Sequence, residues 1–213
     1  MLKSLWERIR FNQKKEWDKI AYGYLNNSDN NGLILDVATG IGRFVEQNPE
    51  QIVGIDWNPK SVKQCKQKGY TVKKGDARDL PFQANKFSGV HCSHLIEHFL
   101  PEDTHKILKE MDRVLTKNGT LVIRSPLMWD KFYSDLTHVK PYNPNSILHY
   151  LTPSSQRTLE HISENYSVIN LKWRYKKLHL PIKYLNTASN VLNRWGFPWL
   201  QRNGYMLVLQ KSG

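Results

Sequence analysis

Short apolar segments alternate with polar or amphipathic ones over residues 33–125. The clearest helical period lies at residues 104–115, where apolar side chains recur at helical spacing. Strands that alternate with helices predict βαβ units, and hence a parallel sheet that is covered on both faces. Five apolar segments have the length of strands: LILDV (33–37), IVGID (52–56), YTVKKGD (70–76), FSGVHCS (87–93) and TLVIRS (120–125).

The flanking segments extend this pattern into one domain over residues 1–213. Residues 1–31 are expected to form a helical lead-in, and residues 176–204 a basic, aromatic insertion before the last strand. Asn143-Pro144 and Thr152-Pro153 each place a capping residue before a proline, which predicts the start of a helix. SVINLKWRY (167–175) and YMLVLQ (205–210) are predicted to be two further strands.

The composition favours a cytoplasmic protein. The two cysteines, Cys65 and Cys92, provide neither a disulfide framework nor a zinc-binding spacing. The N-terminal residues are interrupted by charge, and no apolar run reaches the ~18 residues of a transmembrane helix.

The positive charge is concentrated near the end of the chain. The formal net charge is +12, and residues 165–213 contain eight lysines and arginines but no acidic residue. A basic surface with tryptophans nearby suggests an anionic partner, such as nucleic acid, membrane headgroups or a phosphorylated carrier. A lysine-rich soluble protein would show the same excess.

ILDVATGIGRF (34–44) predicts a ligand-binding turn after the first strand. Gly40 and Gly42 leave room for a ligand near the backbone, and the helix expected next would offer free N–H groups. Neither the P-loop nor the dinucleotide fingerprint fits this turn. Asp56, twenty residues after Asp36, is placed to accept ribose hydroxyls, and Gly75-Asp76-Ala77 to meet an adenine edge. These positions suit S-adenosylmethionine, an adenosine without pyrophosphate.

In these segments the chain resembles the seven-stranded, class I S-adenosylmethionine-dependent methyltransferases. ILDVATGIGRF is similar to their motif I, and VGIDWNP, GDARDLPF, FSGVHCSHLIEHF and LTKNGTLVIRSP are similar to the motifs that follow. Two departures are Ala38, in place of the first motif I glycine, and Ser88, where the family often has aspartate. The resemblance implies a Rossmann-like α/β fold, with a mostly parallel seven-stranded sheet, helices on both faces and an antiparallel C-terminal strand. It implies these cofactor-binding residues: Asp36, Ala38, Thr39, Gly40, Gly42, Asp56, Trp57, Asp76, Ala77, Ser93 and His94.

DLTHVKPYNP (135–144) resembles a segment of bacterial methyltransferases of polysaccharide and lipopolysaccharide synthesis. This resemblance implies a hydroxyl acceptor on a glycan or glycolipid intermediate, whose proton a base must remove. We expect His138 to be that base, with Asp135 orienting it and His98 as a further catalytic candidate. His94 and Glu97 lie in the same region, and the segment could also be a packed loop that only closes the pocket.

His94-Leu-Ile-Glu97-His98 matches the H-x-x-E-H zinc signature. That chemistry needs both histidines on one helical face and a third ligand. Because the motif follows a predicted buried strand inside a methyltransferase-like frame, we expect no metal.

Other functions remain open at this stage. The basic tail also suits an RNA methyltransferase. A small-molecule methyltransferase, a non-catalytic subunit that keeps the fold, and a zinc hydrolase are further alternatives. Residues 181–200 predict an amphipathic helix, which would pack on its own domain, pair two subunits or contact the inner face of the membrane peripherally.

Overall fold

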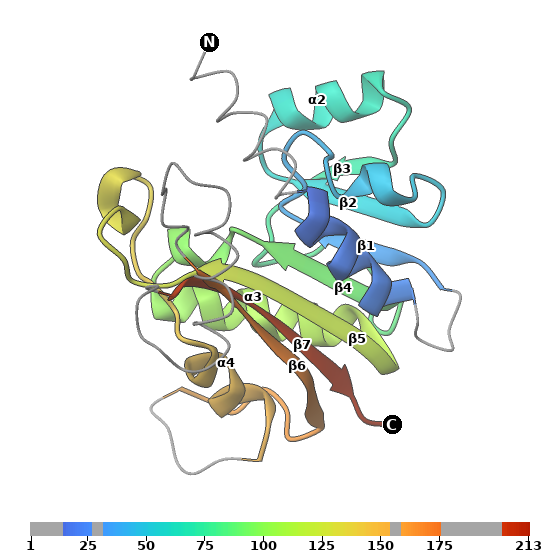
Figure 1. Ribbon diagram of the computed structural model, residues 1–213. Helices are drawn as coiled ribbons and strands as arrows, with labels where there is room; N and C mark the ends of the chain where they lie inside the picture. The colour runs from blue at the N-terminus through green and yellow to red at the C-terminus, as the bar shows by residue number, and fades with distance from the viewer. Residues whose placement is uncertain (1–14, 27–31, 154–158, 176–201) are drawn as a thin grey trace, which may run out of the picture.

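The computed structural model describes residues 15–26, 32–153, 159–175 and 202–213. Seven strands form one sheet in the order β3-β2-β1-β4-β5-β7-β6 (Figure 1). β7 is antiparallel to both of its neighbours, and the other pairs are parallel. The predicted sheet is therefore confirmed. Its strands are β1 (Ile34–Val37), β2 (Ile52–Asp56), β3 (Val72–Lys74), β4 (Phe87–Ser93), β5 (Leu115–Pro126), β6 (Tyr166–Tyr175) and β7 (Arg202–Lys211).

A helix begins at Asn143-Pro144, as predicted, and another begins in the same way at Asn58-Pro59. The Asn58 and Asn143 side chains each accept a hydrogen bond from a backbone N–H two residues on, and a proline follows each at the first helical position. Besides the helix over residues 15–26, the described helices are α2 (Pro59–Gln67), α3 (Pro101–Val114) and α4 (Pro144–Leu151), with short 3₁₀ turns η1 (Val45–Gln47), η2 (Ile96–His98) and η3 (Phe132–Ser134).

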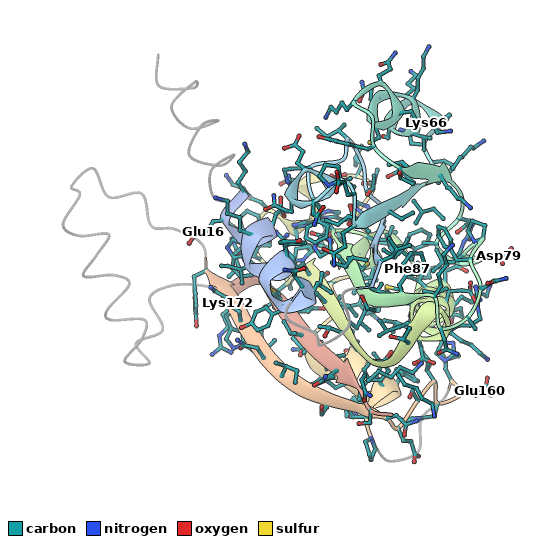
Figure 2. All side chains as sticks on the ribbon, turned by 90° about the vertical axis from the view of Figure 1, so that its right-hand side faces the viewer. Glu16, Lys66, Asp79, Phe87, Glu160 and Lys172 are labelled. Carbon is teal, nitrogen blue, oxygen red and sulfur yellow. The ribbon has the colours of Figure 1, made fainter. Side chains whose placement is uncertain are left out.

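The two faces of the sheet are covered by different helices. On one face, Ala21 and Leu25 of the helix over 15–26 pack with Ile34, Val122 and other strand side chains. On the other face, α3 and α4 pack on a larger apolar cluster. Figure 2 shows Phe87 inside the molecule, with Lys66, Asp79 and Glu160 at its surface. Burial on both faces explains why the central strands are continuous apolar runs.

The prediction of a helix after the glycine turn is wrong. Only the 3₁₀ turn η1 is found there, because Pro49 disfavours helical backbone at the residue before it and β2 already begins at Ile52. The helix over residues 15–26, part of the predicted lead-in, covers this face of the sheet instead.

Other boundaries differ by a few residues. β5 begins at Leu115 and includes Asn118-Gly119, where a break before the strand was expected. The strand continues through these residues because its pairing with β4 shifts register there. Thr152 is the C-cap of α4, and residues 154–158, over which the helix predicted at Thr152-Pro153 would run, lie outside the described residues. β7 begins at Arg202, so the insertion predicted over 176–204 loses its last residues to the strand. The amphipathic helix predicted at 181–200 lies outside the described residues.

Candidate active site

Parallel pairing brings the carboxyl ends of four strands to one edge of the sheet. Val37 of β1 is in register with Ile55 of β2 and Cys92 of β4, and Ser93 is in register with Arg124 of β5. The glycine turn, Asp56 and His94 therefore emerge side by side. Open α/β sheets bind their ligands at this edge.

The two glycines of the turn have different roles. Both have left-handed backbone, with φ of 54° at Gly40 and 82° at Gly42. A Cβ on Gly40 would meet no atom within 4 Å, so this glycine faces open space that a ligand can enter. A Cβ on Gly42 would lie 2.8 Å from the Tyr70 ring and 3.0 Å from Cys65 Sγ. Gly42 is thus needed for packing within the protein, and we assign it no direct ligand contact.

Ala38, which stands in place of a motif I glycine, also has left-handed backbone, with φ of 59°. Left-handed backbone costs a residue with a Cβ about 1–2 kcal/mol, whereas glycine adopts it freely. We expect Ala38→Gly to raise the free energy of unfolding by about 0.5–1 kcal/mol, after the entropy that glycine loses on folding. Urea denaturation measures this change as a higher midpoint at an unchanged slope.

The matched control is Ala77→Gly, because Ala77 belongs to the same edge but not to the residues with positive φ. This control should lower stability. A lower midpoint for Ala38→Gly would contradict the account of the turn.

Asp56 joins the glycine turn to β2. Its carboxylate accepts the Gly40 N–H at 2.7 Å and the Asn58 N–H at 2.8 Å. A carboxylate has about four lone-pair positions, so two remain for ligand hydroxyls. Trp57 follows, and this residue is 79% exposed. The geometry agrees with the predicted placement of both residues.

Asp36 and Thr39 brace the turn from inside the protein. The buried Asp36 carboxylate accepts hydrogen bonds from the Thr39 hydroxyl and, at 2.8 Å, from Nδ1 of His91. His91 in turn stacks on Phe44 with ring centroids 3.8 Å apart. Each Asp36 oxygen thus accepts one hydrogen bond inside the protein, and the direct cofactor contact predicted for this residue stays a prediction. The buried histidine was missed, although a histidine in the apolar strand FSGVHCS signals a polar partner.

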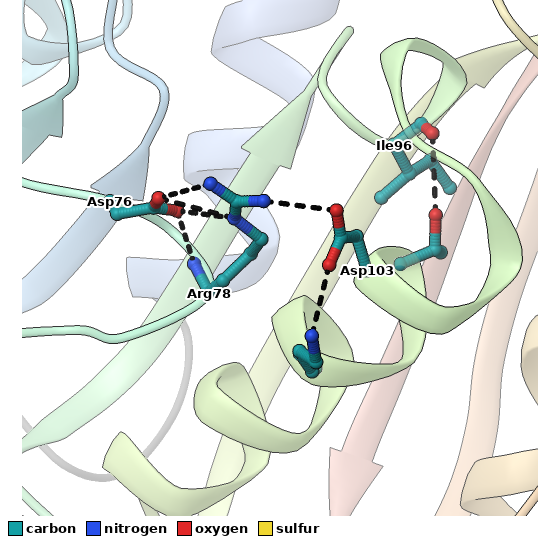
Figure 3. Close-up of polar contacts among 6 residues, drawn as sticks. Asp76, Arg78, Ile96 and Asp103 are labelled. Carbon is teal, nitrogen blue, oxygen red and sulfur yellow. Dashed lines mark hydrogen bonds and ion pairs between the residues drawn. The ribbon is translucent and has the colours of Figure 1, made fainter.

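The Asp76 side chain is engaged by Arg78. The guanidinium of Arg78 donates to Asp76 at 2.7 Å and 3.1 Å and to Asp103 of α3 at 2.9 Å (Figure 3). Hydrogen bonding by Arg78 holds the pKa of Asp76 below its ordinary value. The adenine contact predicted for Gly75-Asp76-Ala77 stays a prediction. The neighbouring Ala77 is only partly buried and packs against the core.

His94 lies in a chain of hydrogen bonds after β4. Its Nδ1 is 3.0 Å from the buried carboxylate of Glu97, and its Nε2 is 3.5 Å from Nη1 of Arg174. Because Arg174 can only donate, Nε2 is an acceptor and Nδ1 carries the proton. Burial lowers the pKa of His94 below its ordinary value. The preceding Ser93 has a buried hydroxyl without a partner among the described residues.

His98 and His138 face one another, with ring centroids 4.9 Å apart. Nδ1 of His98 donates to the Thr137 carbonyl at 3.0 Å, and Nδ1 of His138 donates to the Phe132 carbonyl at 2.7 Å. Both lone pairs are therefore on Nε2. The sequence named both histidines as catalytic candidates, and below we call them the acceptor-side histidines.

The orienting role predicted for Asp135 is wrong. Its carboxylate accepts two hydrogen bonds from Thr137, through the backbone N–H and the hydroxyl. These bonds hold the pKa of Asp135 below its ordinary value. The Phe132 carbonyl orients His138 instead, which a sequence pattern of side chains cannot reveal.

A buried ion cluster behind the turn was also missed. Asp18, fully buried in the helix over 15–26, accepts hydrogen bonds from Arg43 at 2.6 Å and from Arg124 at 2.5 Å. Arg43 belongs to the glycine turn and Arg124 to β5. The cluster thereby fixes the turn between a helix and the central sheet.

Comparisons with known proteins agree with this geometry. Residues 35–123 match the family model described as a methyltransferase domain. A SAM-dependent methyltransferase from Archaeoglobus fulgidus has the same fold, with a TM-score of 0.70, 21% sequence identity and 94% of each chain covered. The structure is thus a Rossmann-like, class I methyltransferase fold. The matched domain and this fold both imply S-adenosylmethionine as the cofactor.

Two curated relatives act on different acceptors. Demethylmenaquinone methyltransferase of Bacteroides fragilis is 36% identical over 112 residues, which are 46% of this chain and 45% of that protein. The tRNA (carboxymethyluridine(34)-5-O)-methyltransferase of Arabidopsis thaliana is 26% identical over 153 residues, 70% of this chain and 37% of that protein. This chain spans less than half the length of either relative.

The residues at the edge of the sheet fit the cofactor. The open space at Gly40 admits a ligand close to the backbone, and Asp56 offers acceptor lone pairs beside it. The unpartnered hydroxyl of Ser93 lies at the end of β4 on the same edge. The Asp56 carboxylate, which can accept hydrogen bonds from ribose hydroxyls, the open backbone at Gly40 and the exposed Trp57 together suit an adenosine with a charged amino acid end.

Proposed function

We propose that this protein transfers a methyl group from S-adenosylmethionine to a hydroxyl oxygen of its acceptor. The observation that carries the proposal is the pair of acceptor-side histidines, whose Nε2 lone pairs are made available by hydrogen bonds from Nδ1 to backbone carbonyls. A hydroxyl is a weak nucleophile until its proton is removed, and neutral imidazole is the side chain best suited to that near neutral pH.

The cofactor supplies a methyl group that its sulfonium already activates. The protein then has to orient the reactants and assist proton loss. Gly40 and Asp56 hold the cofactor, and the acceptor-side histidines meet the hydroxyl. His94 serves as a positioning residue, because both of its ring nitrogens are engaged by Glu97 and Arg174.

We assign the acceptor to glycans or glycolipid intermediates, as the DLTHVKPYNP resemblance implies. Four large apolar side chains are exposed on the loop over 127–143 that carries His138: Met128, Tyr133, Leu136 and Val139. Leu136 is 99% exposed. Such a group of apolar side chains suits an acceptor with an apolar part. No helix among the described residues is long and apolar enough to cross a bilayer.

RNA is the second candidate acceptor. It is favoured by the similarity to the Arabidopsis enzyme, whose name specifies a tRNA uridine oxygen, and by the basic residues at 165–213. Phosphate contacts would make RNA binding fall steeply with salt.

The acceptor is identified by transfer of labelled methyl from S-adenosylmethionine. The protein is incubated separately with a bacterial lipid extract, a polysaccharide fraction and tRNA. Label in the lipid or polysaccharide fraction, held in an ether bond, is the expected result. Label in tRNA alone would replace the glycan assignment, and label on nitrogen would overturn transfer to a hydroxyl.

A further inference from the structure

The acceptor-side histidines and the Glu97 carboxylate form a cluster of three side chains that can ligate a metal ion. One ligand atom each from Glu97, His98 and His138 lies within 4.8 Å of the other two. Glu97 and His98 belong to η2. His138 belongs to the loop over 127–143, which follows α3 and β5 in the sequence. This set differs from the H-x-x-E-H motif, which would use His94.

The backbone excludes His94 from the cluster. At φ of 57° this residue is left-handed, and the following η2 is a 3₁₀ turn rather than an α-helix. The two histidines of the motif therefore do not share a helical face. His94 contacts Arg174, whereas His98 packs against His138.

The two histidines are held as metal ligands usually are. Each donates its Nδ1 proton to a backbone carbonyl, which fixes the tautomer and leaves Nε2 as the electron-pair donor. Metal-binding histidines almost always have such a partner on the other ring nitrogen. The buried Phe132 ring, 4.6 Å from that of His138, further limits its rotation.

Glu97 needs a positive charge that the described side chains do not supply directly. Its side chain is fully buried, and its oxygens accept hydrogen bonds from His94 at 3.0 Å and from Ser125 at 3.2 Å. Among the described residues, no lysine or arginine forms an ion pair with it. Arg174, which lies nearby, donates to Asn203 and His94 instead. A buried carboxylate is costly unless a cation compensates it.

We infer that Glu97, His98 and His138 bind a divalent transition-metal ion of the zinc class, next to the acceptor hydroxyl. Two imidazoles and one carboxylate form a set that zinc uses in catalytic sites, with the fourth position left open. Zn–N bonds are about 2.0–2.1 Å, which places tetrahedral donors roughly 3.3 Å apart, so donors up to 4.8 Å apart must move closer together around the ion. The acceptor oxygen would fill the open position.

The inference rests on the proposed function and changes how the proton is lost. With the ion bound, the Nε2 lone pairs hold the metal instead of taking the proton. The ion lowers the pKa of the bound hydroxyl, whose O–H bond breaks with release of the proton to solvent. The oxygen then forms the bond to the methyl carbon, while the S–C bond breaks and its electron pair stays on sulfur. The products are the methyl ether, neutral S-adenosylhomocysteine and one proton.

Cobalt(II) titration of untagged, chelator-treated protein tests the site, because tetrahedral cobalt absorbs visible light and replaces zinc in such sites. We expect saturation at one equivalent, and competition by zinc. His98→Gln and His138→Gln should each weaken binding by at least about tenfold. The matched control is His105→Gln, because His105 is a partly buried histidine on α3 that contacts the Glu160 carbonyl instead.

The inference is overturned if the native protein shows no stoichiometric binding of cobalt. It is also overturned if His98→Gln and His138→Gln bind cobalt as tightly as the native protein and the His105→Gln control do. Far-ultraviolet circular dichroism of each variant checks folding before titration. The proposed function is tested separately by S-adenosylhomocysteine binding. Protein that binds this product but no cobalt refutes the metal site alone, and protein that binds cobalt but not the product refutes the methyltransferase.

Discussion

Replacing Asp18 by asparagine is expected to lower the free energy of unfolding by about 3–5 kcal/mol, the usual cost of removing one partner from a buried ion pair. Asp18 is fully buried, and Arg124 is only 5% exposed. The variant leaves the Arg124 guanidinium buried without its carboxylate. It also releases Arg43 and with it the glycine turn.

The pH dependence provides an independent check. Burial alone would raise the pKa of Asp18, but attraction and hydrogen bonding from Arg124 and Arg43 outweigh it and lower this pKa. A carboxyl whose pKa is lowered in the folded state stabilises the protein above its unfolded value of about 3.9. That contribution is lost as the pH falls through the lower, folded pKa.

Urea denaturation at neutral and acid pH measures both effects. In Asp18→Asn, the part of the acid destabilisation that comes from this carboxyl should disappear. The control is Asp103→Asn, which removes a partly exposed partner of Arg78 and Lys106 and should change stability little. Equal stability of Asp18→Asn and the native protein would contradict the role of the cluster.

Replacing His138 by alanine is expected to lower kcat by about 10²–10⁴-fold, the range for loss of a group that assists proton transfer. His98→Ala should have a similar effect. The KM for S-adenosylmethionine should stay nearly unchanged, because both rings lie on the acceptor side and do not contact Asp56. The double variant should be little worse than either single one if the two histidines act as a unit.

This effect is measured from steady-state rates of methyl transfer to the fraction that accepts the labelled methyl group. His105→Ala, a histidine on the outer part of α3, should retain native activity. A large rise in the KM for S-adenosylmethionine with unchanged kcat would place these histidines on the cofactor instead of the acceptor.

The sheet and the position of the cofactor edge could be predicted because they follow from local patterns. Apolar runs such as LILDV and IVGID are long enough for strands, and parallel pairing fixes where their carboxyl ends lie. Asp56 could be placed for the same reason, since it ends β2 beside the turn.

Features that depend on distant partners could not be predicted. Asp18 and Arg124 are 106 residues apart in sequence, and no periodicity connects them. Asp76 looked available for a ligand, but Arg78 donates hydrogen bonds to it and to the distant α3 residue Asp103 at the same time. The orientation of His138 depends on the Phe132 carbonyl, which every residue type possesses.

The glycine turn shows where local rules compete. The spacing of its glycines correctly located the turn, but the expected helix was absent because the segment before β2 is short and contains Pro49. The left-handed backbone of Ala38 was likewise hidden, since alanine gives no signal for positive φ.

The most direct test of the central claim is calorimetric titration of the purified protein with S-adenosylhomocysteine, which binds without turnover. The account predicts saturable micromolar binding at one site. Asp56→Ala should remove two hydrogen bonds between the ligand and a charged group, which lowers the binding free energy by about 3 kcal/mol. The affinity for S-adenosylhomocysteine should then fall by roughly 100-fold. The exposed Asp79→Ala should bind normally. Absence of binding in folded native protein, or unchanged binding in folded Asp56→Ala, would contradict the cofactor site at the glycine turn.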